Sequence, residues 1–370
     1  MIEISQHPSA LLKHQWVEII RSGAAKAEET GLLQPKQLEL IYQQQWFKLL
    51  VPDVYSGTEK PLPEMVRLEE SLAWADGSVG WVITLCSGAG WFGGFLPVKT
   101  ASAIFNNVEV CLAGSGASTG TATKTDTGFI INGTWKYASG AQHATHFTAN
   151  CVVKEAHETV LGEDGNPLIL PFIIDKKDVT LISAWKYMGM MGTGSDAFEI
   201  NDLEVPADRS FKIDPEFTVI DHPLYRYPFL QLAEATLAAN LSGMAIHFMD
   251  LCEPVFAEKS TQKKLNDSQK TVVKEALANA VNEMQQIRKE FYQAVDQSWM
   301  LLLQDEKSMV KEALQEVSKT SRQLAKISRE TVDQLYPYCG LLAASPDTEI
   351  NRVWRDFHTA SQHSLLTFLE

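Results

Sequence analysis

The chain has 370 residues, of which 45% are hydrophobic and 21% charged. It is therefore long enough to bury a sizeable core in two or three domains or in one composite unit. Its formal charge of -14, from 32 basic against 46 acidic residues, argues against nucleic acid or an anionic membrane as the main partner.

The five cysteines are widely spaced and include no Cys-x-x-Cys pair. This pattern is typical of reduced, buried thiols in a cytoplasmic protein rather than of a disulfide framework or a metal site. The segment from Met1 to His7 has neither a basic nor an apolar part, so we expect no signal peptide. The most apolar stretch, residues 79–96, is broken by five glycines and makes a poor membrane span.

From residue 8 to about residue 105 the apolar residues recur with helical spacing. Gly31 is expected to end a first helix, residues 35–47 predict a second, and a third begins near Pro63. Asp76 or Ser78 could cap a fourth, strongly apolar helix. On the third helix we expect three charged side chains to face water: Arg67, Glu69 and Glu70.

Between about residues 109 and 211 the apolar period changes to two, which predicts strands. Asn132-Gly133 is a strong turn signal within this region. Because no long helix separates the strands, they favour an antiparallel sheet or small barrel over a βαβ unit. The strands are expected at 108–113, 129–131, 146–153, 168–174, 179–182 and 197–205.

Residues 114–120 form a run of small residues directly after the first predicted strand. Their amides could bind a phosphate or a flavin, and an ordinary turn is the alternative. The run is not a P-loop, because no Gly-Lys-Ser/Thr follows it, and not a dinucleotide fingerprint, because no helix begins after it.

Residues 133–140 read Gly-Thr-Trp-Lys-Tyr-Ala-Ser-Gly. In a strand, Trp135 and Tyr137 point to one face. Ser139 and Gly140 end the strand with a hydroxyl and with a residue that lets a backbone or a ligand approach closely. A β-meander with a packed aromatic face is the alternative.

From residue 225 onward the pattern is helical again. Four long segments with short connections predict an up-down bundle. They are expected at 231–258, 269–303, 307–336 and 347–369. The predicted domains are a helical domain over 1–107, a β-domain over 108–212 and a bundle over 213–370.

This order of elements resembles the acyl-CoA dehydrogenase superfamily over nearly the whole chain. Three stretches carry the resemblance: Cys111 to Thr121, Gly133 to Gly140 and Gly192 to Pro206. The resemblance implies an α+β fold with an N-terminal helical domain, a middle antiparallel β-barrel or sandwich, and a C-terminal four-helix bundle. It also implies FAD or FMN bound against the middle domain. The flavin contacts implied are Leu112, Gly114, Ser115, Gly120, Tyr137, Ala138 and Ser139.

Two details are similar to one branch, the two-component flavin monooxygenases, which take reduced flavin from a partner reductase. These are the Trp-x-Tyr-Ala-Ser-Gly form and the ending Asn351 to Asp356 followed by Ser361-Gln362-His363. By this resemblance His363 is catalytic, and an imidazole suits that role because it titrates near neutral pH. A histidine on a helix surface is the alternative.

The resemblance also implies a homotetramer, which long amphipathic helices favour. Trp81, Trp135 and Met190 are candidates for a substrate pocket and suggest an apolar or aromatic small molecule. Core packing is the alternative for all three.

Three positions depart from the dehydrogenase pattern. Ser345 stands where a Tyr-Glu-Gly-Thr run would place the catalytic glutamate, and a serine beside no base cannot take a proton from carbon. Glu234 is a relocated candidate for that base. Lys259 stands where an arginine would hold the FAD pyrophosphate, and it supplies charge without a bidentate fork.

Three functions remain open on this basis. We favour a monooxygenase-type enzyme, with an acyl-CoA dehydrogenase that uses Glu234 as the second candidate. The third is a non-catalytic, flavin-free binding protein on the same fold.

Overall fold

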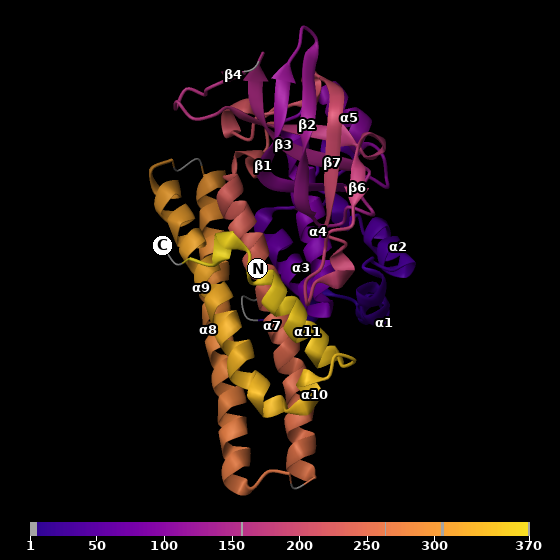
Figure 1. Cartoon of the computed structure of the whole chain (residues 1–370). Coiled ribbons are helices and arrows are strands. Elements are labelled where there is room, and N and C mark those ends of the chain that lie inside the picture. Colours follow the sequence, from indigo (N-terminus) through magenta and orange to yellow (C-terminus); the bar gives the residue numbers. More distant parts are fainter. Residues whose placement is uncertain (1–5, 157, 263, 305–306, 369–370) are drawn as a thin grey trace.

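The computed structural model describes residues 6–156, 158–262, 264–304 and 307–368. Helices come first, strands follow, and a bundle of long helices ends the chain (Figure 1). This architecture confirms the predicted α+β fold class. Within the described ranges, no helix combines the length and the apolar character needed to cross a membrane.

In the part of the chain that the structure describes, five α-helices precede the first strand. Gly31 ends the first of them in the left-handed region, at φ 70°, and Asp76 caps the fourth through a 2.9 Å bond from the Val79 N–H to its carboxylate. Both roles match the sequence prediction. The helices are α1 (His14–Thr30), α2 (Pro35–Gln43), α3 (Leu62–Ala75), α4 (Gly77–Gly90) and α5 (Val98–Phe105).

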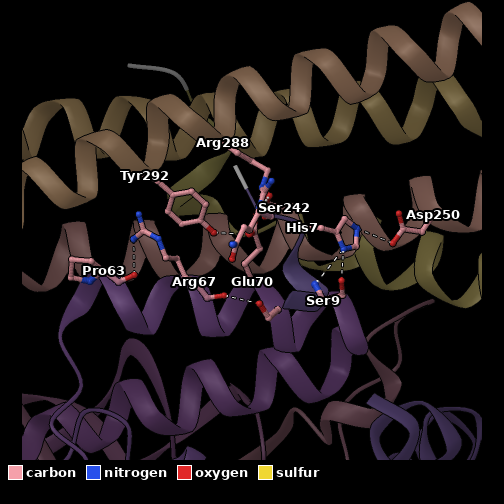
Figure 2. A network of polar contacts seen from close by, with 11 residues as sticks. His7, Ser9, Pro63, Arg67, Glu70, Ser242, Asp250, Arg288 and Tyr292 are labelled. Atoms are coloured by element: carbon pink, nitrogen blue, oxygen red, sulfur yellow. Dashed lines mark hydrogen bonds and ion pairs between the residues drawn. The ribbon is translucent and has the colours of Figure 1, made fainter. Parts of the chain in front are cut away.

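The expectation that Arg67, Glu69 and Glu70 face water is wrong, because all three are buried. Helix α3 is covered on both sides, so its charged face meets partners from other helices instead of solvent. Arg288 and Tyr292 bond to the carboxylate of Glu70, at 2.7 and 2.6 Å (Figure 2). Helical spacing shows where apolar residues gather, but it does not show that the opposite face is also covered.

The strands form one seven-stranded sheet in the order β4-β3-β1-β2-β7-β6, with β5 paired to β3. The expectation of an antiparallel sheet is wrong for one pair, because β1 and β3 run parallel. The chain leaves the end of β2 and crosses back to the start of β1, where the Thr145 N–H donates to the Cys111 carbonyl at 2.7 Å. The strands are β1 (Leu112–Lys124), β2 (Gly128–Ala138), β3 (His146–Glu155), β4 (Glu158–Thr159), β5 (Ile169–Asp175), β6 (Thr180–Ile182) and β7 (Asp196–Pro206).

Two predicted interruptions lie inside continuous strands. The small-residue run 114–120 belongs to β1, and Asn132-Gly133 lies in the middle of β2. In both strands the pairing register shifts at these residues. The turn signal therefore marks irregular pairing, which glycine permits, and not a reversal of the chain.

The C-terminal part is the predicted bundle. Figure 1 shows α7, α8 and α9 side by side, with α11 crossing them and the sheet at one end. The last helix ends at Ala360 and not at residue 369, and the Ser361 carbonyl accepts instead from Arg329 of α9, at 2.5 Å. The bundle helices are α7 (Phe229–Thr261), α8 (Asp267–Leu303), α9 (Lys307–Cys339) and α11 (Glu349–Ala360), with short α6 (Pro223–Arg226) and α10 (Leu341–Ala344) before and within them.

The buried apolar side chains form two clusters. One lies inside the β-sheet region, around Trp135 and Phe147. The other is continuous through the N-terminal helices and the bundle, from Leu12 to Leu366. The first and third predicted domains therefore share one core. The domain boundaries at 107 and 212 stay predictions.

Candidate functional site

The end of β2 meets helix α4 at Gly140. The Cys86 thiol of α4 lies 3.7 Å from the Ser139 carbonyl oxygen, as its hydrogen-bond donor. Gly140 has φ 75°, and a Cβ there would lie 2.8 Å from the Cys86 sulfur. Because only glycine fits this position, the sequence brings the Ser139 end of β2 against the helix that carries Trp81.

The Ser139 side chain belongs to a buried chain of hydroxyl groups. Its Oγ lies 2.8 Å from Ser195 Oγ, which in turn lies 2.6 Å from Thr193 Oγ1. The Thr193 hydroxyl donates to the Met190 carbonyl at 2.7 Å. The three hydroxyl side chains are each at most 5% exposed. The sequence prediction identified Ser139 and Met190 but missed the two residues that connect them.

The loop that carries Met190 is held by helix α11. The Met190 N–H donates to the Asp356 carboxylate at 2.5 Å, and a Cβ at Gly189 would lie 2.1 Å from the Arg355 carbonyl oxygen. Burial raises the pKa of Asp356 to about 7, with the nearby charge of Asp76 adding to the shift. The sequence singled out Asp356 by resemblance, and the structure gives it a physical role in fixing this loop.

The rings of Trp81 and His363 are in contact, with their centroids 6.1 Å apart in an edge-to-face arrangement. His363 directly precedes the turn Ser364–Leu366, and its Nδ1 accepts from the Leu365 N–H at 3.4 Å. Burial lowers the pKa of His363, so the imidazole is neutral at neutral pH. The structure therefore brings two of the predicted site residues, Trp81 and His363, into contact although they are far apart in the sequence.

Tyr137 lies on the exposed side of the same strand end. It is 57% exposed and has φ 68°, and its hydroxyl lies 3.1 Å from that of Tyr187. Trp185 packs edge-to-face against Tyr137, with ring centroids 6.3 Å apart. These three rings form an accessible aromatic surface. Tyr187 was missed, because a tyrosine in an irregular loop has no sequence signal of its own.

The predicted contacts on β1 divide into two groups. The glycines are explained by packing: a Cβ at Gly114 would lie 1.8 Å from the Thr148 hydroxyl oxygen, and a Cβ at Gly120 would lie 2.1 Å from the Trp135 ring. Leu112 is buried at the start of the strand. The register break after Ser115 takes residues 116–119 out of the ladder with β3, and these residues are exposed.

Trp135 and Ala138 lie apart from the accessible part of the site. Trp135 is fully buried and stacks on Phe198 inside the β-sheet region, at 5.1 Å between ring centroids. Its ring N–H donates to the Asn150 carbonyl at 3.0 Å. Ala138 is also fully buried in this cluster. The structure thus gives Trp135 the core-packing role that the sequence left open as the alternative.

Three residues bear on the dehydrogenase alternative: Glu234, Ser345 and Lys259. Glu234 is buried in the bundle, where Arg322 of α9 donates to its carboxylate at 2.7 Å. Ser345 ends the short helix α10. Lys259 donates to the Tyr338 carbonyl at 2.6 Å, close to the end of α7 that lies away from the sheet (Figure 1).

Comparison with known proteins supports the resemblance. Residues 235–368 match the family described as "Acyl-CoA dehydrogenase, C-terminal domain". The flavin-dependent monooxygenase oxygenase subunit HsaA of Rhodococcus jostii is 24% identical over 363 residues, which cover 93% of this chain and 91% of that protein. The chain is thus similar in sequence to flavin-dependent monooxygenases, and its C-terminal part matches a domain of the acyl-CoA dehydrogenases.

Other known proteins are also similar to this chain. The indole-3-acetate monooxygenase of Acinetobacter baumannii is 27% identical over 68% of this chain and 64% of its own length. Among solved structures, the 3-HSA hydroxylase of Rhodococcus sp. RHA1 superposes with a TM-score of 0.85 at 21% identity, covering 95% of this chain and 91% of that one. XiaF from Streptomyces sp., in complex with FADH2 and glycerol, gives a TM-score of 0.80 at 20% identity, over 95% and 90% of the two chains.

The residues of this structure fit a flavin. A flavin ring has a polar edge and two flat faces, so it needs hydrogen-bonding groups beside apolar or aromatic walls. Residues 116–119 lie outside the paired registers of both neighbouring strands; the Gly116 carbonyl accepts from the Asn150 side chain and the Ala117 N–H donates to Ser115 Oγ. Ser139 adds a hydroxyl, and Tyr137 adds an accessible ring.

Proposed function

We propose that the protein is the oxygenase component of a two-component flavin-dependent monooxygenase. It would take reduced FAD or FMN from a partner reductase and oxygenate an apolar, aromatic small molecule. The observation that carries the proposal is the contact between His363 and Trp81, on the helix that also packs against the Ser139 end of β2. The names of the relatives, which include an indole-3-acetate monooxygenase and a resorcinol hydroxylase, support the same substrate class.

The proposed roles follow from the geometry. Residues 116–119, Tyr137 and Ser139 bind the flavin, which when reduced supplies the electrons that activate molecular oxygen. The neutral imidazole of His363 accepts a proton from, or orients, a polar group of the substrate. Trp81 and Met190 are buried in the apolar core, and the proposal keeps them as the apolar wall of the substrate pocket.

The dehydrogenase alternative has weaker support. A base for that reaction must reach the substrate carbon with a free carboxylate oxygen. Glu234 is fully buried: Arg322 binds its Oε1 inside the bundle, and its Oε2 has no partner among the described residues but is itself buried away from a substrate. Ser345 offers no carboxylate in its place.

The first experiment measures binding and then chemistry. We expect purified protein to bind FADH2 or reduced FMN in anaerobic titration, and to convert a substrate such as indole-3-acetate or resorcinol when oxygen and a flavin reductase are added. His363→Ala should lower the rate of substrate oxygenation by ~10²–10⁴-fold, because a positioned proton-transfer group is lost, and more of the oxidised flavin should then release hydrogen peroxide.

His14→Ala is the matched control, because that histidine is on an exposed face of α1, with 89% of its side chain accessible. Three results would contradict the proposal. The first is no flavin binding. The second is an equal loss in the control. The third is anaerobic bleaching of bound flavin by a CoA thioester that survives His363→Ala and is abolished by Glu234→Gln.

We also propose that the protein is a cytoplasmic homotetramer. All five cysteines are free and buried, which suits a reducing compartment. Apolar side chains remain exposed on the bundle and its connections, among them Met300, Leu303 and Leu341, and a second copy could cover them. Light scattering at micromolar concentration should give the mass of four chains, and a stable monomer would exclude this assembly.

A further inference from the structure

Two of the five cysteines lie side by side in the helical bundle. Cys252 belongs to α7, and Cys339 is the last residue of α9. Their sulfur atoms are 3.4 Å apart, although 87 positions separate the two residues in the chain. Both side chains are fully buried. The fold thus brings together two thiols that the proposed function does not use.

The two thiol protons have a fixed order. The Cys339 sulfur lies 3.6 Å from the Leu335 carbonyl oxygen, which can only accept, so Cys339 is the donor in that contact. A thiol has one proton, and Cys252 must therefore donate to the Cys339 sulfur. This hydrogen bond and the positive charge of Lys259 outweigh burial and lower the pKa of Cys339. Of the two thiols, Cys339 is therefore the one that becomes the nucleophilic thiolate.

Lys259 of α7 is held against the end of α9. Its ammonium group donates to the Tyr338 carbonyl at 2.6 Å, and a Cβ at Gly340 would lie 2.8 Å from its Nζ. Tyr338 and Gly340 are the residues directly before and after Cys339. The lysine thus places a positive charge at the end of α9, where it favours the thiolate of Cys339.

The backbone around both cysteines allows the sulfur atoms to approach further. A disulfide bond is about 2.05 Å long, so the sulfur atoms must move together by about 1.4 Å. Pro254 lies inside α7 and Pro337 inside α9, each two residues from a cysteine, and each removes one helical hydrogen bond. Gly340, with φ 68°, is exposed, and Leu341 after it is 89% exposed. A small oxidant therefore reaches Cys339 through local opening of this exposed end of α9.

We propose that Cys252 and Cys339 are a modification site, at which hydrogen peroxide forms a disulfide that ties α7 to the end of α9. The Cys339 thiolate attacks one oxygen of the peroxide, so that an S–O bond forms and the O–O bond breaks. The hydroxide that leaves takes up the proton that Cys339 lost and becomes water. The Cys252 sulfur then attacks the Cys339 sulfur, so that the S–S bond forms, the S–O bond breaks, and the hydroxyl leaves with the Cys252 proton as a second water. Each sulfur is oxidised by one electron, and the peroxide is reduced by two.

The disulfide closes a loop that contains the end of α7, all of α8 and α9. A cross-link over so long a segment stabilises the fold mainly by restricting the unfolded chain. Peroxide from any source serves, so the inference goes beyond the proposed function and does not rest on it. That function nevertheless supplies the oxidant whenever bound flavin is oxidised without oxygenating a substrate. Thiols of a reducing compartment convert the disulfide back to the dithiol, so the modification is reversible.

The test counts the free thiols of the full chain. Reduced protein is treated with hydrogen peroxide under native conditions, freed of peroxide, unfolded and alkylated, and the masses of its peptides are measured. We expect the number of alkylated cysteines to fall from five to three, with one cross-linked pair of peptides that contains Cys252 and Cys339. Dithiothreitol should restore all five. The melting temperature of the oxidised protein should exceed that of the reduced protein by roughly 5 °C.

Single variants separate the two thiols. Cys252→Ser and Cys339→Ser should each abolish the cross-link and the rise in melting temperature. Cys252→Ser should leave a sulfenic acid on Cys339 that dimedone traps, whereas Cys339→Ser should leave none on Cys252. Cys151→Ser is the matched control, because that buried thiol lies in β3, and it should keep both the cross-link and the rise in melting temperature.

Circular dichroism checks that each variant folds, and Cys252→Ala and Cys339→Ala serve if the serine variants do not. Five alkylated cysteines after peroxide treatment would overturn the proposal. A cross-link that survives Cys252→Ser would do the same, because it would join other thiols. None of these measurements uses flavin, so the modification site can fail while the proposed function stands, and the reverse.

Discussion

Glu69 is a buried acid whose surroundings favour the protonated form. It lies on α3 and is 1% exposed, and Ser87 of α4 is its hydrogen-bond donor at 3.5 Å. Burial raises the pKa of Glu69 to about 8, against which hydroxyl donors of Thr84 and Ser87 act only weakly. The folded protein therefore binds a proton here that the unfolded chain releases near its ordinary pKa of 4.5.

We predict that this group makes the protein less stable as pH rises. Between pH 4.5 and about 8 the folded state holds more protons than the unfolded state. The free energy of unfolding is therefore highest below pH 4.5, as far as Glu69 is concerned, and it falls as the pH rises through this window. Glu69→Gln, which is neutral at every pH, should flatten this slope and raise the free energy of unfolding at pH 8 by about 2–4 kcal/mol. Urea denaturation of wild type and Glu69→Gln at pH 5 and pH 8 measures these free energies of unfolding.

The exposed Glu64 on the same helix provides the control. Glu64→Gln should leave the slope between pH 5 and pH 8 as in wild type. A Glu69→Gln protein with the wild-type slope would show that this carboxyl is ionised when folded.

Sequence reasoning at this scale succeeded where a residue belongs to a local pattern. Ser139 and Gly140 were identified by the strand end they form, and Asp76 by its place before an apolar helix. It failed where the decisive partner is distant in sequence. Nothing near Glu70 indicates that Arg288 covers it, and nothing near Ser139 indicates Ser195.

Helix α3 is the element that connects the N-terminal helices to the bundle. Its Glu70 accepts from Ser242 of α7 and from Arg288 and Tyr292 of α8 (Figure 2). Its Arg67 pairs with Asp296 of α8 at 2.8 Å. Burial alone would raise the pKa of Glu70, but the Arg288 guanidinium and the hydroxyl donors outweigh it and hold the pKa below its usual value.

We predict that removing one member of this pair is far more costly than removing both. Glu70→Met leaves the Arg288 charge buried without its partner, and should lower the free energy of unfolding by about 3–5 kcal/mol. The double variant Glu70→Met with Arg288→Met removes both charges of the pair and should recover most of that loss. A double-mutant cycle by chemical denaturation measures the coupling. Additive effects of the two substitutions would contradict the prediction.

The backbones of α3 and α7 approach each other closely at Gly243. A Cβ at Gly243 would lie 2.2 Å from the Glu70 carbonyl oxygen and 2.8 Å from the Trp74 backbone nitrogen. We therefore expect Gly243→Ala to push the helices apart and to lower stability by about 1–3 kcal/mol, although alanine is the better helix former. Gly88→Ala, where a Cβ would meet nothing within 4 Å, is the matched control in α4. Thermal unfolding of both variants compares them.

The elements themselves were largely predictable. Strong helical periods gave α7, α8 and α9 within a few residues of their observed ends. The errors concern glycine-rich strands and the last helix. At Asn132-Gly133 the local turn preference is overridden by pairing of β2 with β7 on both sides of the register shift. The parallel pairing of β1 with β3 depends on how the chain crosses from one strand to the next. The alternation of apolar residues along a strand gives no information on that crossing.

At the scale of the whole molecule, the chain has two cores where the sequence suggested three domains. The apolar cluster of the N-terminal helices continues into the bundle. We therefore predict that the segment 213–370, expressed alone, does not fold cooperatively, because the face of α7 that α3 covers would be exposed to water. Thermal unfolding by circular dichroism should give a broad transition or none, whereas the full chain should give a sharp one. A sharp melt of the fragment would contradict this.

The Glu70–Arg288 pair can form only late in the synthesis of the chain. The two residues are 218 positions apart in the chain. A ribosome adding about 5–20 residues per second needs roughly 10–40 s to reach the second residue after making the first. For most of that interval the nascent α3 has neither its counter-ion nor the surfaces of α7 and α8, because both helices come late in the chain. The N-terminal third of the chain therefore stays without these partners until most of the chain has been synthesised.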